Sequence, residues 1–279
     1  MYGSELSTLV VGLCAALAFD AGARTVTWQP SPGPSLPGQI VDIVAGNYYL
    51  QAPDTIPAGL TTMRLRVQQG AHIAVLVRLD SRHTATDLLR SRREGHSRPA
   101  WMHFLGGPGF PPPGKTANAT LMLTPGDYLL LCDVEDRDGV HHFEKGMFHP
   151  IVVRANVRSE ARMPKTDVTV TMRDYSFAFT PPLHAGNRLL RIVNHGSVMH
   201  EFRLVHVLPG HTGQESMTWT PRSKSARPDE DVTAIVGLLP GAELTTTVPL
   251  VAGEYVAFCV PQLSHHMIQI VRVLPETAR

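Results

Sequence analysis

Hydrophobic and polar residues alternate along short stretches of the chain, and glycine and proline separate these stretches. The stretch LTTMRLRV (60–67) alternates in this way, and TANATLMLTPGDYLLLC (116–132) reads as two such stretches that break at Pro125-Gly126. Alternation with a period of two, bounded by turn residues, predicts half-buried β-strands. Only TDLLRSRRE (86–94) has the pattern of a helix, inside a long loop. We therefore expect the chain to be mostly β.

The strand pattern occurs twice. GNYYLQAPDTIPAG (46–59) resembles RDYSFAFTPPLHAG (173–186), and the segment 116–132 resembles ELTTTVPLVAGEYVAFC (243–259). Six residue pairs share one offset of 127 positions: Tyr48 and Tyr175, Gly59 and Gly186, Arg64 and Arg191, Gly126 and Gly253, Tyr128 and Tyr255, Cys132 and Cys259. A single offset kept over this length predicts two copies of one domain, which we call copy one and copy two.

Composition narrows the class of protein. The chain has 279 residues, of which 43% are hydrophobic and 18% charged, with 23 glycines and 23 prolines, so we expect a globular protein rather than a disordered or coiled-coil one. Its net charge of +1 gives no reason to expect a nucleic acid or an acidic membrane as a partner. About seven short strands in each copy predict two tandem Greek-key β-sandwiches, at 35–156 and 160–276.

The first residues have the pattern of an export signal. Residues 7–19 carry no charge, and the small residues at 21–23 precede Arg24. This apolar run is shorter than the roughly 20 residues that span a bilayer, but it suits a cleaved signal peptide. The start departs from the usual pattern, because it holds Glu5 and no basic residue. We expect a signal peptide at 1–23, no transmembrane helix after its cleavage, and a periplasmic or extracellular protein.

Copy one contains residue types that bind copper. The run GDYLLLCDVEDRDGVHHFEKGMFHPIVV (126–153) includes Cys132, His142 and Met147, and His72 follows an expected strand upstream. Two imidazoles and a thiolate in a trigonal plane, with a weak axial thioether, form a blue-copper site. A buried cysteine or methionine is also an ordinary part of a hydrophobic core, so this second interpretation stays open.

At these residues both copies resemble the cupredoxins. Copy one shows the ligand loop of that family as Gly126, Tyr128, Cys132, His142, Met147 and Val153. Copy two matches it at Tyr255, Cys259, Met267 and Val273, and its upstream ligand position resembles His200. The resemblance covers nearly all of 40–276. It implies a cupredoxin-like fold and one copper ion per chain, bound in copy one by His72, Cys132, His142 and Met147.

Both copies depart from the pattern of the family. In copy one, nine residues separate Cys132 from His142, and we expect the insertion VEDRDG to form a small hairpin that returns His142 to the metal. In copy two, Gln262 stands where the second imidazole belongs. An amide oxygen is a poorer copper donor than an imidazole, so we expect that site to be weaker or empty. Its candidate ligands are His200, Cys259, His265 and Met267.

Three functions are consistent with this sequence. The first is an exported cupredoxin-like protein that binds copper for electron transfer or copper handling, with an unidentified redox partner protein. The second is a copper-free binding or structural module with the same fold. The third, an oxidase or nitrite reductase, needs a second copper centre with many histidine ligands, normally from His-x-His pairs. The sequence contains no His-x-His, and its only close pairs are His141-His142 and His265-His266, which argues against the enzyme.

Overall fold

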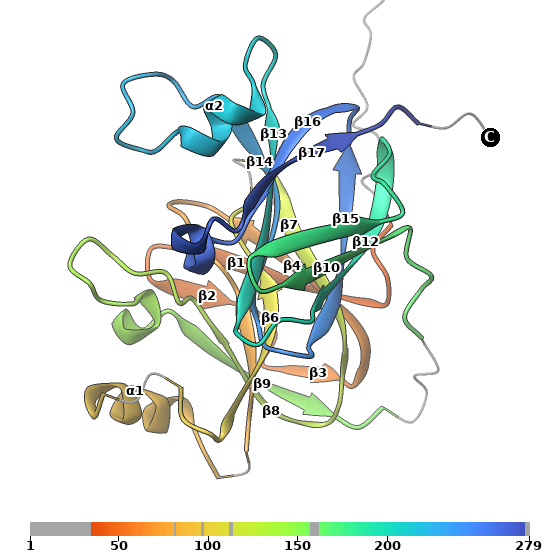
Figure 1. Cartoon of the computed structure of the whole chain (residues 1–279). Coiled ribbons are helices and arrows are strands. Elements are labelled where there is room, and N and C mark those ends of the chain that lie inside the picture. The colour runs from red at the N-terminus through yellow and green to blue at the C-terminus, as the bar shows by residue number, and fades with distance from the viewer. Residues whose placement is uncertain (1–34, 81, 96–97, 112–113, 157–161, 277–279) are drawn as a thin grey trace, which may run out of the picture. The chain divides into compact units, whose positions relative to one another are not determined.

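A computed structural model of the chain describes residues 35–80, 82–95, 98–111, 114–156 and 162–276, which pack as one compact unit (Figure 1). The expected signal peptide at 1–23 lies outside the described residues. Helix α1 (Ala85–Arg93) joins β5 to β6, and the short 3-10 helix η1 (His142–Lys145) joins β8 to β9. The strands of copy one are β1 (Gln39–Gly46), β2 (Tyr49–Gln51), β3 (Thr55–Pro57), β4 (Gly59–Val67), β5 (Val75–Leu79), β6 (Met102–Pro108), β7 (Thr116–Leu123), β8 (Gly126–Leu131) and β9 (Phe148–Arg154).

Copy two follows the same plan. Helix α2 (Gly213–Thr218) joins β13 to β14, and the 3-10 helix η2 (Val260–His265) joins β16 to β17. Its strands are β10 (Val168–Arg173), β11 (Ser176–Thr180), β12 (Gly186–Asn194), β13 (His200–Val207), β14 (Asp229–Leu238), β15 (Glu243–Leu250), β16 (Gly253–Phe258) and β17 (Ile268–Val273). Each copy turns from its first strand into its second at a tyrosine in the left-handed region, with φ of 58° at Tyr48 and 71° at Tyr175.

The strands of the described residues form two sheets. One has the order β11-β10-β12-β15-β7-β4-β1-β2, and the other has the order β17-β16-β13-β14-β6-β5-β8-β9-β3. Side chains of both sheets meet in one core, which contains Ile43 and Leu65 from the first sheet and Leu76 and Leu129 from the second. The expected all-β fold of sandwiched sheets is confirmed.

The two copies are joined edge to edge in both sheets. Strand β7 pairs with β15 at Thr120 and Thr245, and β6 pairs with β14 at Gly107 and Val236. The strand order repeats from one copy to the next, whereas the domain bounds of 35–156 and 160–276 stay a prediction.

A buried tyrosine fixes the same corner in each copy. Its hydroxyl donates a hydrogen bond to the carbonyl oxygen four residues upstream, over 2.8 Å from Tyr128 to Thr124 and over 3.0 Å from Tyr255 to Val251. This tyrosine corner is typical of Greek-key sandwiches. The repeat seen in the sequence therefore extends to individual hydrogen bonds.

The helices lie in equivalent connections, outside the sheets (Figure 1). Helix α1 confirms the expectation for 86–94, while α2 was missed because six residues show too little periodicity. Each helix begins with a capping box, formed by Thr84 with Asp87 in α1 and by Thr212 with Glu215 in α2. Among the described residues, neither is long or apolar enough to cross a membrane.

Candidate metal centre

Three buried side chains of copy one converge at one end of the sandwich. Nδ1 of His72 lies 3.2 Å from Nδ1 of His142, and Sγ of Cys132 lies 3.7 Å from the first nitrogen and 3.5 Å from the second. Among the described residues, these three form a cluster of possible metal ligands whose donor atoms lie within 4.8 Å of one another. Three of the four residues expected in copy one are therefore brought together.

The spacing of these donor atoms fits a transition-metal ion. A point in the plane of the two nitrogens and the sulfur lies about 2 Å from each of them. Metal–imidazole bonds in zinc sites measure about 2.0–2.1 Å and metal–thiolate bonds about 2.3 Å. A small outward shift of the sulfur would meet both lengths. The cluster thus has the size and the His₂Cys chemistry of a blue-copper plane.

The backbone of Met147, the expected axial ligand, is hydrogen-bonded to two residues of this cluster. It is fully buried, and its carbonyl oxygen accepts a hydrogen bond of 3.1 Å from the backbone N–H of Cys132. Its own N–H donates to the carbonyl oxygen of His142 over 3.0 Å. These two hydrogen bonds hold the backbone of Met147 beside the backbones of Cys132 and His142.

The insertion between Cys132 and His142 folds into the small hairpin that we expected. Glu135 and His141 form an antiparallel bridge, and the N–H of Asp136 donates to the carbonyl oxygen of Val140 over 2.9 Å. The N–H of His142 then donates to Val134 over 2.8 Å. Because the hairpin closes on itself, nine intervening residues still return the imidazole to the thiol.

Asp136, at the turn of this hairpin, binds the outer edge of His142. Its Oδ1 lies 3.0 Å from Nε2 of His142, and because a carboxylate only accepts, this nitrogen carries the proton. The lone pair of Nδ1 is therefore free to face the thiol. Lys145 and Tyr48 donate to Oδ2 over 2.5 Å and 2.7 Å, and these hydrogen bonds hold the pKa of Asp136 well below its usual range.

Burial controls the charge of the cluster. It raises the pKa of the Cys132 thiol to about 11, although hydrogen bonds from the backbone of Ile73 and Val134 act in the opposite direction. Burial also lowers the pKa of His72, and repulsion from His142 acts in the same direction whenever His142 is protonated. At neutral pH the metal-free cluster thus contains a neutral thiol and a neutral His72.

Copy two keeps the upstream histidine, the cysteine and the methionine of this arrangement. Nδ1 of His200 lies 3.7 Å from Sγ of Cys259, and both side chains are fully buried. Met267 is also fully buried, and its carbonyl oxygen accepts a hydrogen bond of 3.0 Å from the N–H of Cys259. Three of the four candidate ligands of copy two therefore lie in the places equivalent to those of copy one.

The fourth candidate, His265, lies away from this group. The N–H of Met267 donates to Gln262 over 3.2 Å, just as the N–H of Met147 donates to His142, so Gln262 takes the place of the second imidazole. His265 is exposed and packs on the ring of Tyr175, with the ring centroids 4.6 Å apart. The structure therefore does not bring His265 together with His200 and Cys259.

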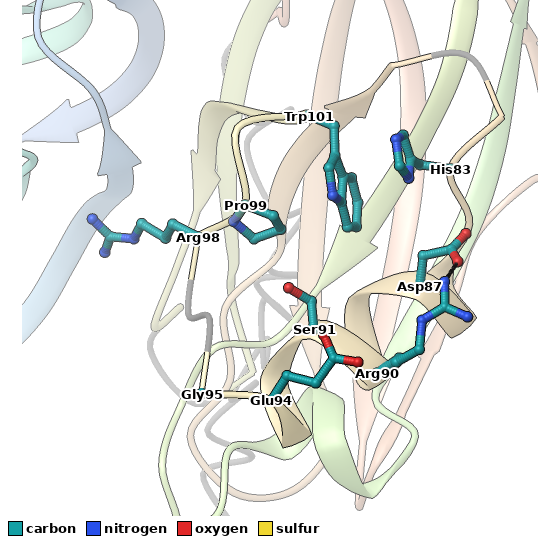
Figure 2. A pocket seen from close by; sticks show the side chains of 9 residues that line it. All are labelled: His83, Asp87, Arg90, Ser91, Glu94, Gly95, Arg98, Pro99 and Trp101. Carbon is teal, nitrogen blue, oxygen red and sulfur yellow. Dashed lines mark hydrogen bonds and ion pairs between the residues drawn. The ribbon is translucent and has the colours of Figure 1, made fainter.

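A separate pocket of about 660 Å³ lies beside α1 (Figure 2). Trp101 and His83 stack there with their centroids 4.3 Å apart, and Arg90 pairs with Asp87. No residue of the Cys132 cluster lines this pocket. We therefore do not include it in the metal centre.

Two carboxylates of these sites escaped the sequence analysis. The sequence pattern marks Asp136 only as part of an acidic insertion and does not predict its contact with His142. It does not mark Asp174, which lies 3.1 Å from Nε2 of His200. Asp174 immediately precedes the repeated Tyr175, whereas Asn47 occupies that position in copy one. A comparison of the residues next to each repeated pair would have drawn attention to it.

No protein-family model and no curated protein sequence matches the chain. Similar solved structures include reduced auracyanin from the photosynthetic bacterium Roseiflexus castenholzii, with 17% identity, a TM-score of 0.29, and coverage of 42% of this chain and 98% of that one. A multicopper oxidase matches with 14% identity and a TM-score of 0.25 over 85% and 88% of the chains. The copper nitrite reductase from Nitrosomonas europaea matches with 12% identity and a TM-score of 0.25 over 86% and 94%.

The TM-scores of these three structures lie below 0.5, so the likeness to them supports no conclusion about this chain. What this chain can bind is therefore argued from its own donor atoms.

Proposed function

We propose that copy one binds one copper ion through His72, Cys132 and His142, with Met147 as the axial ligand, and that the protein transfers electrons. The observation that supports this proposal is the convergence of two imidazole nitrogens and one thiol sulfur within 3.7 Å of one another. A bound copper ion would supply one-electron chemistry at this point.

The residues of copy one have separate tasks in this proposal. Cys132 gives up its proton when the ion binds, because a thiolate is the ligand while the metal-free thiol has a pKa of about 11. His72 and His142 offer the lone pairs of their Nδ1 atoms. Asp136 keeps the proton of His142 on Nε2 and so holds the ring in the ligating tautomer.

Electron transfer is favoured over copper handling by the rigidity of copy one. Cys132 directly follows β8, and backbone hydrogen bonds tie it to Met147 and Phe143 on the ligand loop. Donors fixed in this way need to move little when the charge of the ion changes. The proposal includes export by the segment 1–23, function in the periplasm or outside the cell, and a redox partner protein.

Absorption spectroscopy after addition of Cu(II) tests the proposal. We expect an intense visible band from the thiolate–Cu(II) bond and one copper per chain by metal analysis. Cys132→Ser should abolish the band, whereas Cys259→Ser, the matched change in copy two, should leave it in place. His142→Gln, which gives copy one the donor set of copy two, should also remove the band.

Two results would contradict this function. A protein that shows no visible band with Cu(II) would favour the copper-free module. A band that survives Cys132→Ser but not Cys259→Ser would place the site in copy two. Circular dichroism of each variant shows whether the fold is retained.

A further inference from the structure

Copy two holds its histidine and cysteine at the same separation as copy one. Nδ1 of His200 lies 3.7 Å from Sγ of Cys259, which equals the distance from His72 to Cys132. Both residues of copy two are fully buried. The pair is therefore more than a lone cysteine in a core, because a buried nitrogen of its partner is aimed at the sulfur.

A carboxylate orients this imidazole as well. Nε2 of His200 lies 3.1 Å from Oδ1 of Asp174, so the ring proton is on Nε2 and the lone pair of Nδ1 faces Cys259. Asp174 is itself fixed by the N–H of Ser197 over 2.9 Å and by the Ser197 hydroxyl over 2.7 Å.

The sulfur of Cys259 also accepts a hydrogen bond from the backbone. The backbone N–H of Glu201 donates to Sγ over 3.2 Å. A hydrogen bond to the charged form of a group stabilises that form. Met267 is fully buried, and its backbone is hydrogen-bonded to Cys259 and Gln262 as that of Met147 is to Cys132 and His142, so we take its thioether as the third donor.

The missing second imidazole decides which ion this set suits. Thiolate and thioether ligands select soft ions such as Cu(I), and also zinc, whereas tetragonal sets of nitrogen and oxygen ligands are typical of Cu(II). Gln262 stands where copy one has His142, so copy two has lost the donor that favours Cu(II). We propose that His200, Cys259 and Met267 form a second copper site that binds Cu(I) in preference to Cu(II). This inference goes beyond the proposed function, which concerns copy one alone.

Titration of Cu(I) against a Cu(I) chelator, without oxygen, tests the proposal in the full chain with Cys132→Ser. Because Cys132→Ser removes the thiol of copy one, only copy two keeps a candidate thiolate ligand among the two proposed sites. We expect about one Cu(I) per chain, lost when Cys259→Ser is added, and an affinity about 10–100-fold lower with Asp174→Asn. Cys132→Ala serves as a second background if Cys132→Ser does not fold. No Cu(I) bound, or binding unchanged by Cys259→Ser, would overturn the site.

A gain-of-function variant tests the selectivity. With Cu(II), the Cys132→Ser chain should show no intense visible band, and adding Gln262→His should create one by supplying the missing imidazole. A band with Gln262 intact would overturn the preference for Cu(I), and no band with Gln262→His would overturn the assigned donor set. Failure of the copy-one proposal is recognised separately, by the absence of a visible band in the unmodified chain.

Discussion

The carboxylate of Asp136 lies 3.0 Å from Nε2 of His142, so the insertion that lengthens the ligand loop also supplies a partner for the ligand. The same carboxylate accepts hydrogen bonds from Lys145 and Tyr48. Tyr48 lies edge-on to the imidazole, with the ring centroids 5.3 Å apart. These contacts close the outer side of His142, which is 8% exposed at its side chain.

Replacing Asp136 by asparagine should weaken copper binding in copy one. Partners that orient a metal-ligating histidine typically contribute 10–100-fold to metal affinity, so we expect Asp136→Asn to lower the Cu(II) affinity by about that factor. Competition with a Cu(II) chelator measures it. Asp138→Asn is the matched control, because Asp138 also accepts from Lys145 but is not a partner of His142. Equal effects of the two variants would show that only the charge of the hairpin matters.

The metal-free protein should lose stability at alkaline pH. Burial raises the pKa of Cys132 and of Cys259 from 9.0 to about 11, so the folded protein keeps these protons more tightly than the unfolded chain. Their contribution is complete below pH 9 and is lost as the pH rises toward 11, by about 1.4 kcal/mol per pH unit and thiol at most.

Urea unfolding between pH 8 and pH 10.5 measures this loss. The Cys132→Ala/Cys259→Ala variant should unfold with a flatter dependence on pH over the same range. A slope that stays the same in this variant would assign the alkaline loss to groups other than the two thiols.

The two tyrosine corners should contribute equally to stability. Tyr128→Phe and Tyr255→Phe each remove a hydrogen bond to a backbone carbonyl and one further contact of the hydroxyl, with the Thr124 hydroxyl over 3.3 Å or with the N–H of Val251 over 3.1 Å. We expect each change to lower the free energy of unfolding by about 1 kcal/mol. Chemical denaturation gives the values. Tyr49→Phe, which removes an exposed hydroxyl bound to Gln68, should change stability by less than about 0.5 kcal/mol. A large difference between the two corners would contradict their equivalence.

Asn118 should be important for the junction of the two copies. Its Nδ2 donates to the carbonyl oxygen of Thr247 and its Oδ1 accepts from the N–H of Thr247, each over 2.8 Å. Asn118→Ala leaves both buried backbone groups without this partner, so the free energy of unfolding should fall by about 2 kcal/mol or more. Denaturant unfolding checks this value, with the exposed Asn47→Ala as control. An unchanged stability would mean that the junction does not depend on this side chain.

The sequence by itself determined the fold class and most of the candidate ligands. Alternating polarity marked the strands, and the shared offset marked Cys132 and Cys259 as equivalent positions. These features are local or repeated, so they remain visible in a linear pattern. The replacement of the second imidazole by Gln262 was visible for the same reason, because the spacing from Cys259 to Met267 is undisturbed.

Only the tertiary structure decided which groups meet. The role of Asp136 depends on a hairpin whose closure brings it to His142, and the position of His265 on Tyr175 depends on the turn at the end of η2. The edge-to-edge pairing of β7 with β15 and of β6 with β14 uses backbone groups, which every residue carries, so no side-chain pattern reports it. Contacts made through the backbone or through a loop's path are set by the folded chain as a whole, and for that reason the sequence pattern does not contain them.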